Sequence, residues 1–129
     1  MDNLFIAATA STPEIDFRFS DHTLTMKGES YPENAVSFYG NVLNAVREYL
    51  KHCNDTDITL NMALAYCNSS STKLLFSMLE TFSHAVKAGN RVTLYWYHEE
   101  EDDTLYDFGQ EIHEDYPDLT FVDKPVESH

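Results

Sequence analysis

Residues 58–82 read ITLNMALAYCNSSSTKLLFSMLETF, and the fold class is most clearly predicted from this segment. Its first part alternates apolar and polar residues and then becomes almost continuously apolar, which is typical of a central strand covered on both faces. Its last part has apolar residues at three- and four-residue spacing, which predicts an amphipathic helix that ends near Gly89. Between them lie five polar residues, Asn68 to Thr72. A buried strand that leads through a polar turn into such a helix predicts an α/β domain.

Upstream of this stretch, a β-hairpin and a helix are expected. Residues 15–19 alternate between apolar and polar, and the alternation resumes at 24–26 after a turn at 20–22. This pattern predicts two antiparallel strands, with Gly28 ending the second. A helix is predicted from residues 31–33, where Pro and Glu suit a first turn, to about Cys53.

Downstream, the pattern of strand and helix continues. Residues 92–97 alternate as a strand, residues 105–116 have helical spacing before Pro117, and residues 119–122 form a last short strand. The predicted order is strand, strand, helix, strand, helix, strand, helix, strand. This order favours a mixed sheet with an N-terminal hairpin and with helices packed against it.

Length and composition fit one domain. With 129 residues, 43% of them hydrophobic, the chain can bury a single core. We expect the domain to span residues 1–123 and a flexible tail to follow over 124–129. The sequence contains neither a charged, apolar leader nor a run of membrane-spanning length, so the expected location is the cytoplasm. Cys53 and Cys67 are then expected to be reduced core thiols.

The net charge restricts the partners. Acidic residues outnumber basic ones by 22 to 8, which gives a charge of −14. Such a surface repels nucleic acid and anionic membranes, whereas a basic patch on another protein suits it. Five carboxylates, Glu99 to Asp103, follow the strand at 92–97. They form either a solvated turn or a docking surface, and they lie near Ser69 if the two preceding strands are parallel.

The polar turn contains more hydroxyl groups than a helix cap requires. One Asn or Ser satisfies the N-cap, yet Ser69, Ser70, Ser71 and Thr72 all follow Asn68. A phosphate-binding loop is disfavoured, because no glycine lies between residues 40 and 89. Covalent phosphorylation fits better, since a helix N-terminus tolerates added negative charge. A partner that packs on the neutral turn would then have to bury a dianion and would be released.

Four ordered segments carry a resemblance to a known family: Ser11–Ile15, Gly28–Asn34, Tyr66–Lys73, and Trp96 and Tyr97 with the acidic run. In these segments the chain resembles the SiaC family of regulatory phosphoproteins, which act in bacterial partner-switching circuits and look like STAS-domain anti-sigma-factor antagonists. The resemblance covers most of the chain. It implies a STAS-like fold and a protein that is regulated by phosphorylation and is not itself an enzyme.

The resemblance also implies the partners and the modified residue. The unphosphorylated form would bind and activate a diguanylate cyclase, and thereby regulate c-di-GMP and biofilm formation. A cognate serine/threonine kinase would block this binding, and a PP2C-like phosphatase would restore it. The phosphorylated residue falls on Ser69, with Ser70 as the alternative, although many relatives have threonine at this place. The expected partner-binding residues are Asn68, Ser70, Ser71, Thr72, Lys73, Tyr31 and Glu99.

Other functions leave weaker signals. A serine hydrolase would need Ser69 or Ser70 beside His84 or His113, but the chain lacks the Gly-x-Ser-x-Gly turn. His98 beside Glu99, and His113 between Glu111 and Glu114, match no metal-ligand spacing. We therefore expect no metal and no cofactor. A constitutive adaptor, which binds its partner regardless of phosphorylation, remains as a further alternative.

Overall fold

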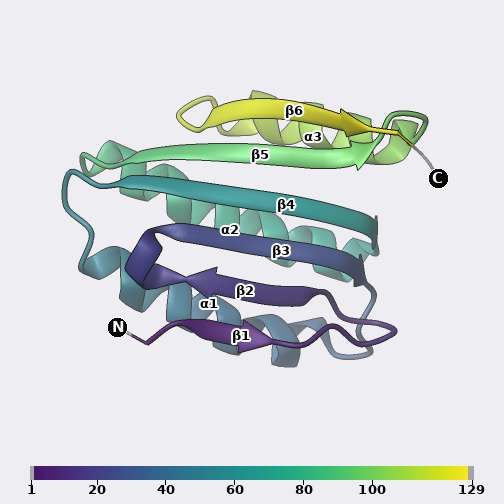
Figure 1. Ribbon diagram of the computed structural model, residues 1–129, viewed down its shortest axis with the longest axis horizontal. Coiled ribbons are helices and arrows are strands. Elements are labelled where there is room, and N and C mark those ends of the chain that lie inside the picture. The colour runs from purple at the N-terminus through teal and green to yellow at the C-terminus, as the bar shows by residue number, and fades with distance from the viewer. Residues whose placement is uncertain (1, 128–129) are drawn as a thin grey trace.

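The computed structural model describes residues 2–127, which form one mixed sheet with helices against it (Figure 1). Six strands lie side by side in chain order: β1 (Leu4–Ile6), β2 (Glu14–Arg18), β3 (Thr23–Ser30), β4 (Asp57–Cys67), β5 (Arg91–Glu99) and β6 (Thr120–Val126). Three α-helices connect the later strands: α1 (Ala35–Lys51), α2 (Ser69–Lys87) and α3 (Asp103–Asp115). The predicted fold class is confirmed.

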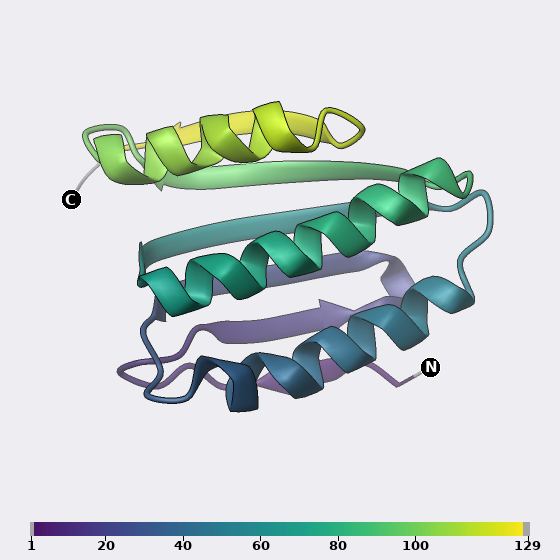
Figure 2. The same cartoon turned by 180° about the vertical axis from the view of Figure 1, so that it is seen from behind.

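The connections place all three helices on one face of the sheet. Strands β1, β2 and β3 pair antiparallel, whereas β3, β4, β5 and β6 run parallel, with one helix in each crossover. Because the strand order never reverses, crossovers of one hand return every helix to the same side. Figure 2 shows α1, α2 and α3 in front of the sheet. The result, over residues 2–127, is a two-layer domain whose opposite sheet face has no helix.

The core lies between the sheet and the helices. Alternate residues of β2, β3, β4 and β5 point toward the helices and are buried, as Ile58, Leu60 and Met62 of β4 illustrate. Trp96 of β5 lies under α3, and its indole N–H donates to the carbonyl of Leu105 at 2.9 Å. The opposite sheet face has polar or partly exposed residues at the intervening positions. This alternation made the expected strands visible in the sequence, but the expectation that β4 is covered on both faces is wrong.

Several predicted boundaries are wrong. Strand β1 was not expected, and it adds an edge to the hairpin through antiparallel pairing with β2. Strand β3 passes Gly28 with a register shift and ends at Ser30. Helix α1 starts at Ala35, because Asn34 caps it by accepting from the backbone N–H of Ser37 at 3.0 Å. Residues 31–33 therefore precede the helix.

The C-terminal boundary also differs from the expected one. Strand β6 continues to Val126, so residues 124–126 pair with β5 instead of forming the start of a tail. Of the expected tail, residues 128 and 129 lie outside the described part of the chain.

Parallel pairing brings the functional segments to one end of the sheet. Strands β3, β4 and β5 all end there, and helices α1, α2 and α3 each begin shortly after one of them. In open α/β sheets this end is where binding sites form. The positive ends of three helix dipoles also lie there.

Candidate functional site

The turn from β4 into α2 is fixed by the asparagine at its centre. The side-chain oxygen of Asn68 accepts from the backbone N–H of Ser71 at 2.9 Å, which makes Asn68 the N-cap of α2. The backbone N–H of Asn68 donates to the carbonyl of Ser30 at 2.9 Å and so ties the turn to β3. The hydroxyl of Thr72 donates to the carbonyl of Asn68 at 3.0 Å. The helix thus starts at Ser69, before the end of the serine run.

A buried chain of three hydroxyl groups lies beneath this turn. The hydroxyl of Ser30 donates to that of Ser71 at 2.8 Å and lies 2.5 Å from that of Tyr39. Ser30 and Ser71 are both 0% exposed. Burial raises the pKa of Tyr39 to about 12. The network joins β3, α1 and α2 below the helix start.

The network divides the predicted hydroxyl residues into two groups. Ser71 was expected to contact a partner, but it has no exposed surface and instead supports the turn from inside. The hydroxyl of Thr72 is bonded to the backbone of its own turn. Ser69 and Ser70 are exposed, and within residues 2–127 neither side chain makes a hydrogen bond. Ser69 and Ser70 are thus the most exposed hydroxyls of the cluster.

Exposed apolar side chains lie at the same end of the sheet as the two serines. Tyr31 is 40% exposed and Tyr66 is 52% exposed, and their rings meet edge to face at a centroid distance of 5.8 Å. Val36, on the first turn of α1, is 70% exposed. We call the surface formed by Tyr31, Val36, Tyr66, Ser69, Ser70 and Lys73 the serine edge. Aromatic groups exposed together in this way are characteristic of protein-binding surfaces.

A groove runs along the serine edge between the first turns of α1 and α2. It has a volume of about 370 Å³ and is lined by Glu33, Asn34, Ala35, Val36, Ser70, Lys73 and Leu74. Ser70 and Lys73 therefore face the same space. Lys73 is exposed, and no carboxylate within residues 2–127 lies in salt-bridge distance of its ammonium group.

The acidic run lies at the same end of the sheet, because β4 and β5 are parallel. Glu99, Glu100 and Glu101 are exposed, whereas Asp102 caps α3 by accepting from the backbone N–H of Leu105 at 3.0 Å. Asp102 also lines a cavity of about 210 Å³ together with Tyr66 and others. The acidic run thus adjoins the serine edge, as the sequence predicted for parallel strands.

Cys67 ends β4 directly beside the cap. It is half-buried and free, and its sulfur lies 3.5 Å from the hydroxyl of Thr72. Burial raises the pKa of the thiol, so the thiol form is favoured.

The residues required by the alternative functions do not meet. His84 lies in the last turn of α2, about 22 Å along the helix from Ser69 by helical rise, and it pairs with Glu80. His113, on α3, packs against the ring of Phe121. Neither histidine is therefore positioned as a base for Ser69 or Ser70 in the described part of the chain.

The predicted metal-ligand candidates are also separate. Both ring nitrogens of His98 have partners, the carboxylate of Asp123 at 2.8 Å and the carbonyl of Glu99 at 2.8 Å. Within residues 2–127 no three His, Cys, Asp or Glu side chains are grouped to hold a metal.

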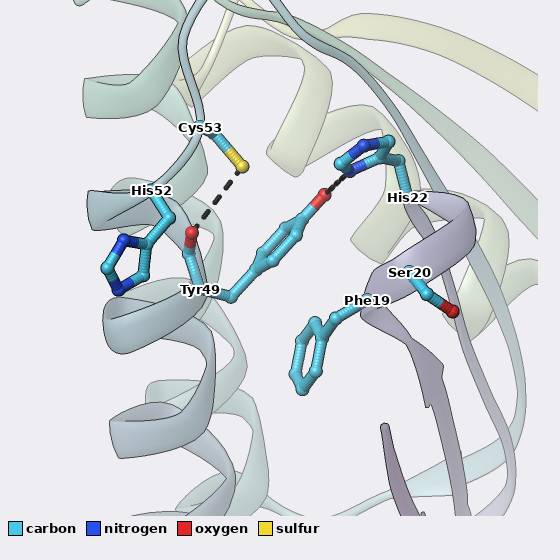
Figure 3. Close-up of a pocket in the computed structure, with 6 residues that line it drawn as sticks. All are labelled: Phe19, Ser20, His22, Tyr49, His52 and Cys53. Atoms are coloured by element: carbon cyan, nitrogen blue, oxygen red, sulfur yellow. Dashed lines mark hydrogen bonds between the residues drawn. The ribbon is translucent and has the colours of Figure 1, made fainter. Parts of the chain in front are cut away.

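A second pocket lies at the opposite end of the sheet (Figure 3). Its volume is about 190 Å³, and Phe19, Ser20, His22, Tyr49, His52 and Cys53 line it. The hydroxyl of Tyr49 points at Nδ1 of His22, 2.5 Å away, and its ring stacks on Phe19. Sequence reasoning missed this cluster, because its members come from two segments that are distant in sequence, the turn between β2 and β3 and the end of α1. The bond between Tyr49 and His22 and the stacking of Tyr49 on Phe19 pack the end of α1 against the hairpin.

Sequence reasoning also missed Tyr66 as a site residue. The signal was present, since Tyr66 directly precedes Cys67 and Asn68 in the segment that resembles the family.

Among residues 2–127, no helix has the length and apolar character to cross a bilayer.

Comparisons with known proteins agree with the geometry. The model of a family described as SiaC family regulatory phosphoprotein matches residues 6–126. The chain is 31% identical over 115 residues to an uncharacterized protein of Pseudomonas aeruginosa strain UCBPP-PA14. The aligned region covers 89% of this chain and 90% of the relative.

Solved structures of SiaC from Pseudomonas aeruginosa have the same fold. The apo-SiaC crystal structure is 30% identical with a TM-score of 0.88, over 96% of this chain and 99% of that one. A chain in the crystal structure of the diguanylate cyclase SiaD with its activator SiaC is 29% identical with a TM-score of 0.89, over 95% and 99%. In that complex the cyclase activity belongs to SiaD. The chain described here belongs to the SiaC family of regulatory phosphoproteins.

Proposed function

We propose that this chain is a phosphorylation-controlled activator in a bacterial partner-switching circuit. The unphosphorylated form binds a diguanylate cyclase through the serine edge and activates it, which raises c-di-GMP and favours biofilm formation. A cognate serine/threonine kinase modifies Ser69, with Ser70 as the alternative, and releases the cyclase. A PP2C-like phosphatase restores the binding form. The circuit operates in the cytoplasm.

One observation carries the proposal: within residues 2–127, Ser69 and Ser70 have exposed, unbonded hydroxyls at the start of α2, and the exposed ring of Tyr66, three residues before Ser69, contacts that of Tyr31. A phosphate there adds about −1.5 to −2 charges, which the helix dipole and the free N–H groups of the first turn accommodate. The domain can therefore stay folded in both forms. A partner that packs over the rings and serines would have to bury the dianion, which is unfavourable by several kcal/mol unless cations meet it.

The proposed cyclase partner has support from the relative, because SiaC of Pseudomonas aeruginosa is crystallised with the cyclase SiaD as its activator. The kinase and the phosphatase rest on the family resemblance. The acidic run beside the serine edge adds a charge pattern that suits a basic patch on either kind of partner.

Phosphosite mapping tests the modification. The protein is incubated with the cognate kinase or with lysate and ATP, and its peptides are analysed by mass spectrometry. We expect phosphate on Ser69 or Ser70, and the Ser69→Ala and Ser70→Ala variants should identify which. Ser77 is the matched control, because it is exposed on the same helix but its hydroxyl donates to the carbonyl of Lys73. Modification solely outside residues 69–72 would contradict the proposal.

Binding assays test the switch. Ser69→Ala should retain affinity for the cyclase, and the phosphorylated protein should lose it by at least tenfold. Equal binding by both forms would instead indicate a constitutive adaptor. Specific labelling by a serine-reactive activity probe that Ser69→Ala abolishes would indicate a hydrolase.

A further inference from the structure

Lys73 is placed one helical turn from both proposed phosphorylation sites. It follows Ser69 by four residues and Ser70 by three, and side chains at these spacings lie on the same face of a helix. Ser70 and Lys73 line the same groove between α1 and α2. The ammonium group can therefore reach a phosphate on either serine without any change in the backbone.

Within residues 2–127, the ammonium group of Lys73 has no carboxylate partner in the unmodified protein. Glu33 lines the same groove, yet it is not within salt-bridge distance of Lys73. Five of the other seven Lys and Arg residues of the described chain are paired with carboxylates, as Lys27 is with Glu14 and Lys87 is with Asp118. Lys73 is thus a cation at an acidic end of the molecule that no described carboxylate neutralises.

We infer that Lys73 forms an ion pair in cis with the phosphate on the first turn of α2, so that phosphorylation both adds an anion to the serine edge and withdraws its cation. This inference rests on the proposed function, since it assigns a role at the same site. In the unmodified form the ammonium group is available to a carboxylate of the partner. In the modified form the ammonium group is paired with the phosphate. One covalent event thereby removes two features that a docked partner uses.

Phosphorus NMR measures this pairing directly. Phosphoserine is introduced during translation at position 69, and separately at position 70, and the ³¹P shift is followed between about pH 5 and pH 8 around the second phosphate pKa near 6. A neighbouring cation favours the dianion and lowers this pKa. The Lys73→Met variant should therefore raise it by about half a unit, as expected for one exposed charge pair. High salt should reduce the difference between the variants.

Two controls separate the ion pair from other effects. Lys73→Arg keeps the charge and should leave the phosphate pKa close to that of the wild-type chain. Lys87→Met removes the same charge from the far end of α2 and should not move it, because about 26 Å of helix intervenes for Ser70 at 1.5 Å per residue. Equal melting temperatures of the wild-type chain, Lys73→Met and Lys73→Arg verify that the two variants fold.

The outcomes distinguish this inference from the proposed function. A Lys73-dependent pKa in either phosphorylated form supports the ion pair, and its absence from both overturns it. Because translation installs the phosphate, the result does not depend on any kinase. If no kinase modifies residues 69–72, the proposed function fails whatever the ³¹P titration shows.

Discussion

Ser70 and Ser71 are neighbours of one residue type with opposite surroundings. Ser70 is exposed on the groove, while Ser71 is fully buried and accepts from Ser30. Both are in the first turn of α2, where one residue step rotates a side chain by about 100°. That rotation alone moves a hydroxyl from solvent into the buried network. At the residue scale, the site therefore consists of serines that present a surface and a serine that holds it in place.

Stability measurements should separate these roles. Ser71→Ala removes the acceptor of the Ser30 hydroxyl inside the core, so we expect the free energy of unfolding to fall by about 1–3 kcal/mol. Ser69→Ala and Ser70→Ala should change it by less than about 0.5 kcal/mol. Urea unfolding followed by circular dichroism gives these values. Equal effects of Ser70→Ala and Ser71→Ala would show that the network contributes nothing to the turn.

The buried tyrosine of the network should make the protein sensitive to alkali. Burial raises the pKa of Tyr39 from 10.0 to about 12. Between these values the folded protein holds a proton that the unfolded chain has released. The contribution of the neutral Tyr39 hydroxyl to the free energy of unfolding is therefore fully present below pH 10, and it is lost as the pH rises through about 12. The loss amounts to about 2–3 kcal/mol for a shift of two units.

The Tyr39→Phe variant tests this assignment. Its free energy of unfolding should fall less steeply between pH 10 and 12 than that of the wild-type chain, as measured by urea unfolding at each pH. Some slope should remain, because burial also raises the pKa of Tyr49. Identical slopes in the two proteins would assign the alkaline sensitivity to other groups.

At the scale of elements, α3 depends on close contact with β5. Gly109 faces the buried indole of Trp96, and a Cβ at this position would lie 2.6 Å from Cδ1 and 2.7 Å from Nε1 of that ring. The ring cannot move away freely, because it is 1% exposed and bonded to the carbonyl of Leu105. Only glycine allows the helix to approach the strand this closely.

Two alanine substitutions test this contact. Gly109→Ala should destabilise the protein by about 1–3 kcal/mol through overpacking. Gly40→Ala, inside α1 where the added Cβ meets no atom within 4 Å beyond the adjacent helix backbone, should stabilise it by up to about 1 kcal/mol through helix propensity. Urea unfolding monitored by the fluorescence of Trp96 measures both. If Gly109→Ala left the free energy of unfolding unchanged, α3 would be able to shift away from β5 at little cost.

The elements that sequence reasoning found are those with a long periodic pattern. Strand β4 and helix α2 bury one regular face each, and their type could be predicted from hydrophobic spacing. Strand β1 has only three residues, with Phe5 exposed between two partly buried neighbours, so its pattern is too short to recognise. The start of α1 was misplaced because Pro32 suits a first turn, yet Asn34 supplies the cap that determines it.

The candidate site was only partly predictable. The cap, the exposed serines and the neighbouring acidic run followed from residue order and from parallel strands. The burial of Ser71 did not, because it depends on Ser30 and Tyr39, which are distant in sequence. Likewise, the groove arises where the first turns of α1 and α2 pack side by side. Contacts of this kind depend on packing between elements, which a local pattern does not contain.

At the scale of the whole molecule, a charge of −14 must be separated from the local effect of the acidic run. Replacing Glu99, Glu100 and Glu101 with Gln removes three charges beside the serine edge and leaves Asp102 to cap α3. If the run contacts a basic patch of the cyclase, the triple variant should bind it several-fold more weakly and with a smaller salt dependence. Titration calorimetry at low and physiological ionic strength measures both quantities.

A matched variant distinguishes position from net charge. Glu111→Gln, Glu114→Gln and Asp115→Asn remove the same three charges in the second half of α3, where all three side chains are exposed. If the variant at 99–101 weakens binding and this one does not, the acidic run contacts the partner. Equal weakening would mean that long-range attraction to the whole molecule is responsible. Unchanged affinity in both would leave the carboxylates of the run as a solvated turn, and binding would then rest on the serine edge alone.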